Sequence, residues 1–135
     1  MRRLIPGESY ALILSEFEAL VNEMKSLQPD LKVELTEATG LSKPLEISPD
    51  SAIAQAAIAS AQRTIGHAKF CGAPWGSDAS TLSHLAGVPC VVLGPDSVVK
   101  HGHSPNESVS LDAVAQAARI YEELAIDFGN RLRAT

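Results

Sequence analysis

The chain has 135 residues, of which 45% are hydrophobic and 20% charged, a balance that is typical of a globular domain and excludes disorder. Its formal net charge is −5 and no basic cluster exceeds the pair Arg2-Arg3, so we expect no nucleic-acid partner. No apolar run approaches the roughly 20 residues of a membrane span. The start of the chain also lacks the apolar region of a signal peptide. We therefore expect a cytoplasmic protein without a membrane partner.

The first third of the chain predicts a helix between two strands. Apolar residues recur at three- and four-residue steps from Tyr10 to Leu27, Ser9 can cap this helix, and Pro29 stops it. In residues 31–36, apolar and polar side chains alternate, which predicts a half-buried strand. Residues 2–5 are expected to form the other strand.

The remainder of the chain alternates predicted helices with short apolar runs. Helices are expected over residues 50–63 and 79–85, with a last helix that begins after Ser110. Strands are expected over residues 68–71 and 89–93, the latter buried on both faces. This order predicts an α/β fold with a doubly wound sheet. Sites in such sheets lie in the loops after the strands, which here are residues 72–78 and 94–107.

The loop at residues 94–107 is the richest in chemically useful groups. It contains His101, His103, Asn106 and Glu107. Imidazole is a common metal ligand and a common general base. Histidines in polar loops are more often simply solvated than functional, so the residue types alone favour two solvated loop histidines and leave the functional interpretation open as the alternative.

The loop at residues 72–78 offers a different kind of site. Asp78 follows Gly76 and Ser77 at the start of a predicted helix, where a capping role is the simplest interpretation. The backbone of Gly76 and Ser77 could also present N–H groups to an anion. Cys71 and Cys90 lie on predicted buried strands and are expected to be unreactive core thiols.

Four motifs in register carry a resemblance to a known family. They are Arg3-Leu4-Ile5-Pro6-Gly7-Glu8, Gly76-Ser77-Asp78-Ala79, the run from Gly87 to Pro95, and His103-Ser104-Pro105-Asn106-Glu107. Together they resemble the C-terminal portion of the zinc aminoacylase/carboxypeptidase superfamily, and most closely its acetylornithine deacetylase and succinyl-diaminopimelate desuccinylase members. The resemblance implies hydrolysis of an amide bond in an N-acyl amino acid or peptide, with water activated by zinc or cobalt.

The same resemblance implies domains and residue roles. Residues 1–40 would be the second half of a lid, or dimerisation, domain, residues 41–49 a linker, and residues 50–135 the C-terminal part of a catalytic α/β domain. His103 matches the last metal ligand, with His101 as the alternative if the loop is shifted. The substrate-binding residues would be Arg3, Gly76, Ser77, Asp78 and Asn106. Self-association through the lid is also expected.

The chain departs from the family where most of the metal ligands should be. The family's ligands begin with a His-x-Asp motif, and none of the four histidines here has Asp two positions later. The Glu122-Glu123 pair lies on the last predicted helix, which is the wrong element for the family's Glu-Glu pair. We therefore expect a C-terminal portion that is inactive and holds no metal stably by itself. The alternative is a non-catalytic module that acts in dimerisation or small-molecule binding.

Overall fold

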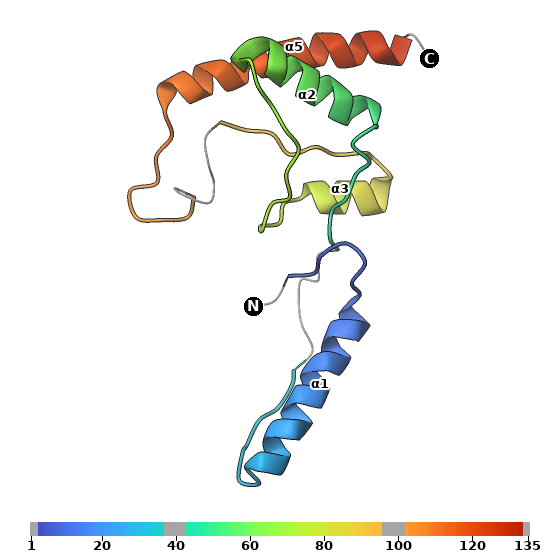
Figure 1. Cartoon of the computed structure of the whole chain (residues 1–135), viewed down its shortest axis with the longest axis vertical. Helices are drawn as coiled ribbons and strands as arrows, with labels where there is room; N and C mark the ends of the chain where they lie inside the picture. Colours follow the sequence, from blue (N-terminus) through green and yellow to red (C-terminus); the bar gives the residue numbers. More distant parts are fainter. Residues whose placement is uncertain (1–2, 37–42, 96–101, 134–135) are drawn as a thin grey trace.

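The computed structural model describes residues 3–36, 43–95 and 102–133, whose regular structure consists of helices (Figure 1). The helices are α1 (Tyr10–Leu27), α2 (Ala52–Ile65), α3 (Ala79–Ala86) and α5 (Leu111–Arg133). Each lies where the sequence predicts a helix, and α5 extends from the residue after Ser110 to Arg133. The helix predictions are therefore confirmed.

Local capping interactions explain where these helices begin and end. The hydroxyls of Ser9, Ser51 and Ser110 each accept a hydrogen bond from the backbone N–H three residues further on, at 3.2, 3.4 and 3.4 Å. Gly66 and Gly87 end α2 and α3 in the left-handed conformation, with φ of 81° and 66°. A side chain would be strained at both glycines, so these two residues are well suited to stop a helix.

The buried core lies between α2 and α5, which pack along one another (Figure 1). The α2 side of this core consists of small side chains: Ala54, Ala56, Ala57, Ser60 and Ala61. The α5 side contributes Ala117 and Ile120. Small residues let two helix backbones approach closely, because the distance between helix axes is set by the side chains at the contact. The contact is thus tight but buries little apolar surface.

Charged groups on the rim of the core reinforce the same pair of helices. Arg63 on α2 lies 3.4 Å from a carboxylate oxygen of Glu123 and 3.6 Å from one of Asp127, both on α5. Arg131 also bonds Asp127, at 3.2 Å. The hydrogen bond from Arg131, with the charges of Arg131 and Arg63, lowers the pKa of the Asp127 carboxyl. Arg63 and Glu123 are exposed and Asp127 is half-buried, so we expect these pairs to add less than the apolar packing does.

The predicted α/β fold is wrong for the described residues. Residues 3–5, 31–36, 68–71 and 89–93 are not paired into β-strands, so neither the doubly wound sheet nor the strands of the predicted lid are present there. Alternating apolar residues show only which face a strand would bury once its neighbours exist. A helix satisfies its backbone within its own segment, whereas a strand needs the N–H and C=O groups of a distant one.

Without a sheet, apolar side chains that were expected to be buried remain in contact with water. Phe70 is 46% exposed and Val92 47%, although both lie on predicted strands. The prediction of two buried thiols is wrong as well, since Cys71 is exposed and Cys90 is only half-buried. The chain has an accessible surface of 10316 Å², whereas a compact protein of this mass exposes about 6,800 Å².

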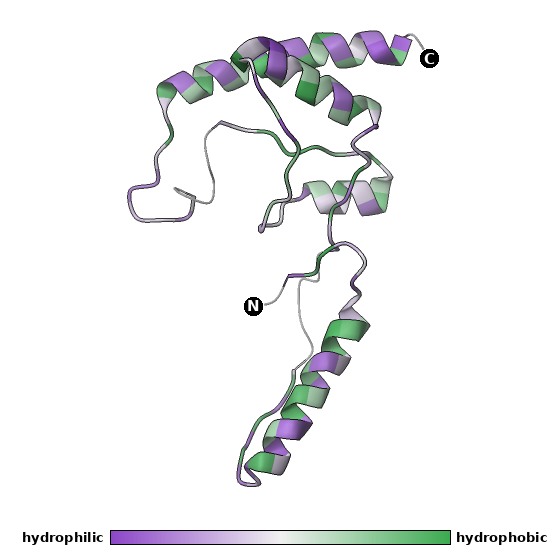
Figure 2. Cartoon of the chain, in the orientation of Figure 1, coloured by the Kyte–Doolittle hydropathy of each residue, from purple (hydrophilic) through white to green (hydrophobic). Residues whose placement is uncertain are grey.

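The segment of α1 and residues 31–36 extends away from the α2–α5 core (Figure 1). Ile13 is the buried residue of α1, and apolar bands alternate with polar ones along its length (Figure 2). A shallow groove separates α1 from the returning chain and is lined by Glu18, Val21, Asn22, Lys25, Val33, Glu34 and Leu35. In the described part of the chain, none of the helices combines the length and apolar character that crossing a membrane requires.

The packing of α2 on α5 predicts that truncating an isoleucine of α5 lowers the free energy of unfolding only where that isoleucine is buried. Ile120 is 6% exposed and Ile126 is 57% exposed. Ile120→Ala should lower the free energy of unfolding by about 2–4 kcal/mol, because it removes buried contacts and leaves a cavity. The matched change Ile126→Ala should alter it by less than about 0.5 kcal/mol. Urea unfolding followed by circular dichroism checks both values, and equal losses in the two variants would contradict this packing.

Candidate functional site

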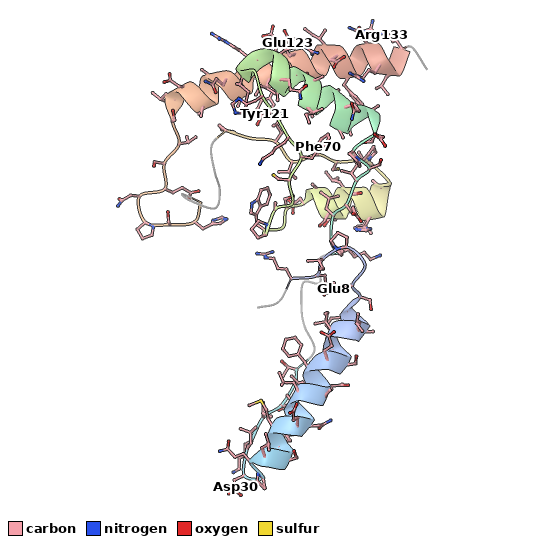
Figure 3. The ribbon with its side chains drawn as sticks, viewed as in Figure 1. Glu8, Asp30, Phe70, Tyr121, Glu123 and Arg133 are labelled. Atoms are coloured by element: carbon pink, nitrogen blue, oxygen red, sulfur yellow. The ribbon has the colours of Figure 1, made fainter. Side chains whose placement is uncertain are left out.

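Two hydrogen bonds close the turn that follows Arg3. The N–H of Glu8 donates to the carbonyl of Ile5 at 3.0 Å, and the N–H of Ile5 donates to a carboxylate oxygen of Glu8 at 2.9 Å. Pro6 and Gly7 are the two central residues, and Gly7 has φ of 89°, which only glycine adopts readily. Figure 3 labels Glu8 where this turn meets α1. The turn thus fixes the direction in which the Arg3 segment leaves the helix.

Arg3 meets the glycine loop that precedes α3. A Cβ atom placed on Gly76 would lie 3.1 Å from Nη1 of Arg3, closer than most side-chain contacts in proteins. The guanidinium therefore lies against the Cα of Gly76, on the side where any other residue would carry its side chain. Two residues that the sequence predicts to bind substrate are thus brought together, although most of the chain separates them.

The start of α3 supplies the next two predicted residues. The carbonyl of Ser77 accepts hydrogen bonds from the N–H and the hydroxyl of Ser80, at 3.2 and 3.1 Å. Asp78 occupies the capping position, but its side chain makes no capping hydrogen bond and it has helical dihedral angles of −62° and −14°. Its exposed carboxylate therefore does not play the capping role that the sequence predicts for it. Trp75 is half-buried in the same loop.

His103 and Asn106 lie in a separate, tightly turned segment. Both have left-handed backbone angles, with φ of 56° and 63°, and the N–H of Glu107 donates to the carbonyl of Ser104 at 3.1 Å. Such angles are uncommon for residues other than glycine, although asparagine and histidine adopt them more often than most. They are often found where a side chain must be aimed for function. The imidazole of His103 is exposed. The alternative ligand His101 lies outside the described residues.

The structure does not join these two groups of residues into one site. Residues 102–107 form a loop at the edge of the molecule, apart from the loop that precedes α3 (Figure 1). Across residues 3–36, 43–95 and 102–133, no three His, Cys, Asp or Glu side chains gather closely enough to hold a metal ion. The described residues thus contain no complete zinc or cobalt site, and the role of His103 as a ligand stays a prediction.

Two contacts near the predicted site were not expected from the sequence. The hydroxyl of Tyr121 donates to the carbonyl of Leu93 at 2.9 Å, at the start of the loop that leads to His103. A ring nitrogen of His84 lies 2.8 Å from the carbonyl of Pro44 and ties α3 to the segment before α2. Tyr121 lies on the helix predicted after Ser110. The polar end of its ring, which usually finds a hydrogen-bond partner where the ring packs, was the available signal.

Comparison with known proteins identifies the family. The model of peptidase family M20/M25/M40 matches residues 6–127, which includes the loop before α3 and the turn that contains His103. Comparisons with curated proteins and with solved structures gave no match. Arg3 lies just outside the matched residues, so its contact with Gly76 is independent of that match. Because the match covers most of its length, the chain belongs to peptidase family M20/M25/M40, a family of hydrolases that are typically metal-dependent.

Proposed function

We propose that this chain forms the carboxylate-recognition part of a metal-dependent amidohydrolase that resembles acetylornithine deacetylase. Membership of peptidase family M20/M25/M40 supports hydrolase chemistry, and substrates of this class are peptides or N-acyl amino acids. The observation that carries the proposal is the contact between the Arg3 guanidinium and Gly76. This contact places a positive charge beside Gly76, where no side chain would block a substrate from reaching the guanidinium.

The chemistry of the guanidinium suits an amino-acid carboxylate. Its N–H groups form a planar fork that can donate two parallel hydrogen bonds to one carboxylate. A carboxylate held in this way would fix the position of the neighbouring amide bond relative to the reacting water. Ser77 and Asp78 follow Gly76 directly, and we propose that they contact the same substrate. We propose a further substrate contact for the amide of Asn106.

His103 is proposed to supply one metal ligand. A zinc or cobalt ion bound there would polarise the substrate carbonyl and lower the pKa of a bound water. A catalytic zinc normally has three protein ligands, so the remaining ligands would come from residues other than those described around His103. The left-handed backbone of His103 is consistent with a side chain that is aimed at a particular position.

The segment formed by α1 and residues 31–36 is proposed to mediate self-association. Apolar side chains on α1 are 40% to 80% exposed at Phe17, Leu20, Met24 and Leu27. Covering them against a second copy would remove apolar surface from water, which is the main driving force of association. Sedimentation velocity should therefore show a concentration-dependent dimer. A single monomeric species at the highest soluble concentration would contradict this proposal.

The carboxylate proposal predicts which ligands the chain distinguishes. An N-acetyl amino acid should bind, and its matched carboxamide should bind much more weakly, because the carboxamide lacks the charge that pairs with Arg3. Arg3→Ala should weaken binding of the acid roughly 10- to 100-fold, which is the range of charge-assisted hydrogen bonds. Titration followed by the backbone amide signals of residues 72–78 gives the dissociation constants.

Two glycines provide a matched control for this titration. Gly76→Ala introduces a Cβ that displaces the Arg3 guanidinium and should weaken binding, though less than Arg3→Ala does. Gly72→Ala introduces the same methyl group where no atom lies within 4 Å, and should leave binding unchanged. Equal binding of acid and carboxamide, or equal effects of the two alanines, would contradict the proposed subsite.

The metal proposal predicts a difference between two nearby histidines. In enzyme that contains a complete ligand set, His103→Ala should lower zinc affinity by about 100-fold or more, since even residues that only support a ligand cost 10- to 100-fold. His101→Ala should have a small effect. Competition with a chromophoric chelator measures both affinities. A damaging His101→Ala with a silent His103→Ala would show that the predicted ligand is in the wrong register.

A further inference from the structure

A long-range hydrogen bond attaches α3 to the chain that leads into α2. The Nε2 atom of His84 lies 2.8 Å from the carbonyl oxygen of Pro44, and 40 positions separate the two residues in the sequence. Because a carbonyl oxygen only accepts hydrogen bonds, Nε2 carries the hydrogen and His84 is the donor. In Figure 1, the chain that leads into α2 runs past α3.

The helix α3 is too short to keep its place without contacts to other parts of the chain. It has 8 residues, whereas isolated helices shorter than about 12–15 residues are marginal in water. Among the described helices, α2 and α5 pack together, and α3 contacts none of the others. Ser80 is buried near the beginning of α3, while His84 lies in its last turn. The bond to Pro44 is therefore an attachment for the C-terminal half of α3.

The acceptor lies on a segment that is tied to the core helix α2. Residues 44–51 lead directly into α2, and the side-chain amide of Gln55 in that helix donates to the carbonyl of Pro49 at 2.8 Å. The rings of Pro44 and Pro49 fix their φ angles, which limits how this segment can bend. His84 thus connects α3 to the core through residues that the structure describes.

The opposite end of α3 holds the loop that contains Gly76. Both the N–H and the hydroxyl of Ser80 donate to the carbonyl of Ser77, which is the residue next to Gly76. The guanidinium of Arg3 lies against Gly76. At 1.5 Å per residue, α3 is about 12 Å long, so a change in its direction at one end displaces the other end. The direction of α3 therefore sets where Gly76 lies relative to Arg3.

We propose that His84 is a positioning residue for the contact between Arg3 and Gly76, acting through the direction of α3. Its bond to Pro44 holds the C-terminal half of the helix, and the first turn of the helix holds the loop. The importance of this contact for substrate rests on the proposed carboxylate site, whereas the contact itself can be measured without a ligand. The inference adds a residue outside the loop that makes no substrate contact of its own.

His84→Ala tests the proposal in the full chain, because it removes the hydrogen-bond donor. Alanine is the best helix former, so the substitution does not weaken α3 through helix propensity. In the ligand-free chain, we expect weaker nuclear Overhauser cross-peaks between the side-chain protons of Arg3 and the α-protons of Gly76 than in the unmodified chain.

Amide hydrogen exchange in α3 provides a second measurement on the same variant. The N–H of Leu82 donates to the carbonyl of Asp78 at 3.0 Å within the helix. In His84→Ala, its exchange should accelerate about two- to tenfold, which is the range that one hydrogen bond provides. The core amides of Ala117 and Ile120 serve as the reference, because their exchange reports a change in global stability.

Two further variants separate positioning from a general loss of stability. His84→Gln keeps a side-chain N–H donor and should restore most of the cross-peak intensity. His67→Ala removes another exposed histidine, whose ring nitrogen lies 3.2 Å from the carbonyl of Ile65, only two residues away. This variant should leave the cross-peaks and the exchange of Leu82 unchanged. Equal losses in His84→Ala and His84→Gln, or in His84→Ala and His67→Ala, would overturn the proposal.

The outcomes also separate this inference from the proposed function. Cross-peaks between Arg3 and Gly76 that depend on His84 support the inference even if no N-acetyl amino acid binds to the chain. Cross-peaks that persist at full intensity in His84→Ala overturn the inference and leave the carboxylate site standing. Absence of these cross-peaks from the unmodified chain overturns both.

Discussion

The packing of α2 against α5 is the interaction on which the arrangement of the described residues depends. It buries the alanines of α2 against Ala117 and Ile120 of α5, and the Arg63 ion pairs lie along its rim. Individual side-chain contacts connect other described parts of the chain. Tyr121 connects α5 to Leu93, and Arg3 reaches Gly76. Because alanine side chains bury little apolar area, this small core orients the loops without enclosing them.

Helices and strands differed sharply in how well the sequence predicted them. The serine caps at Ser9, Ser51 and Ser110 and the glycine at Gly66 act within one or two turns of their own helix, so local sequence contains the needed information. The alternation in residues 31–36 and the apolar run in 89–93 are equally clear in the sequence. A strand is stabilised by groups on another segment, however, and those pairings are absent from the described residues.

The candidate site was predictable in its residues and much less in its geometry. Resemblance to a family singled out Arg3, Gly76 and His103, but no spacing rule indicates that the Arg3 guanidinium lies against the Cα of Gly76. The capping role of Asp78 was predicted from its position, whereas the structure gives its side chain no such bond. Tyr121 was missed as a contact residue because helical periodicity predicts only which residues lie on the same face of the helix. It does not predict which loop the tyrosine hydroxyl contacts.

The central claim is that the chain itself brings Arg3 and Gly76 together, which would give a member of peptidase family M20/M25/M40 a place for the carboxylate of its substrate. The most direct measurement is a nuclear Overhauser spectrum of the isotopically labelled chain without ligand. The account predicts cross-peaks between the side-chain protons of Arg3 and the α-protons of Gly76, and their loss or displacement in Gly76→Ala. Arg3 signals at unfolded-peptide positions, with no cross-peak to Gly76, would contradict it.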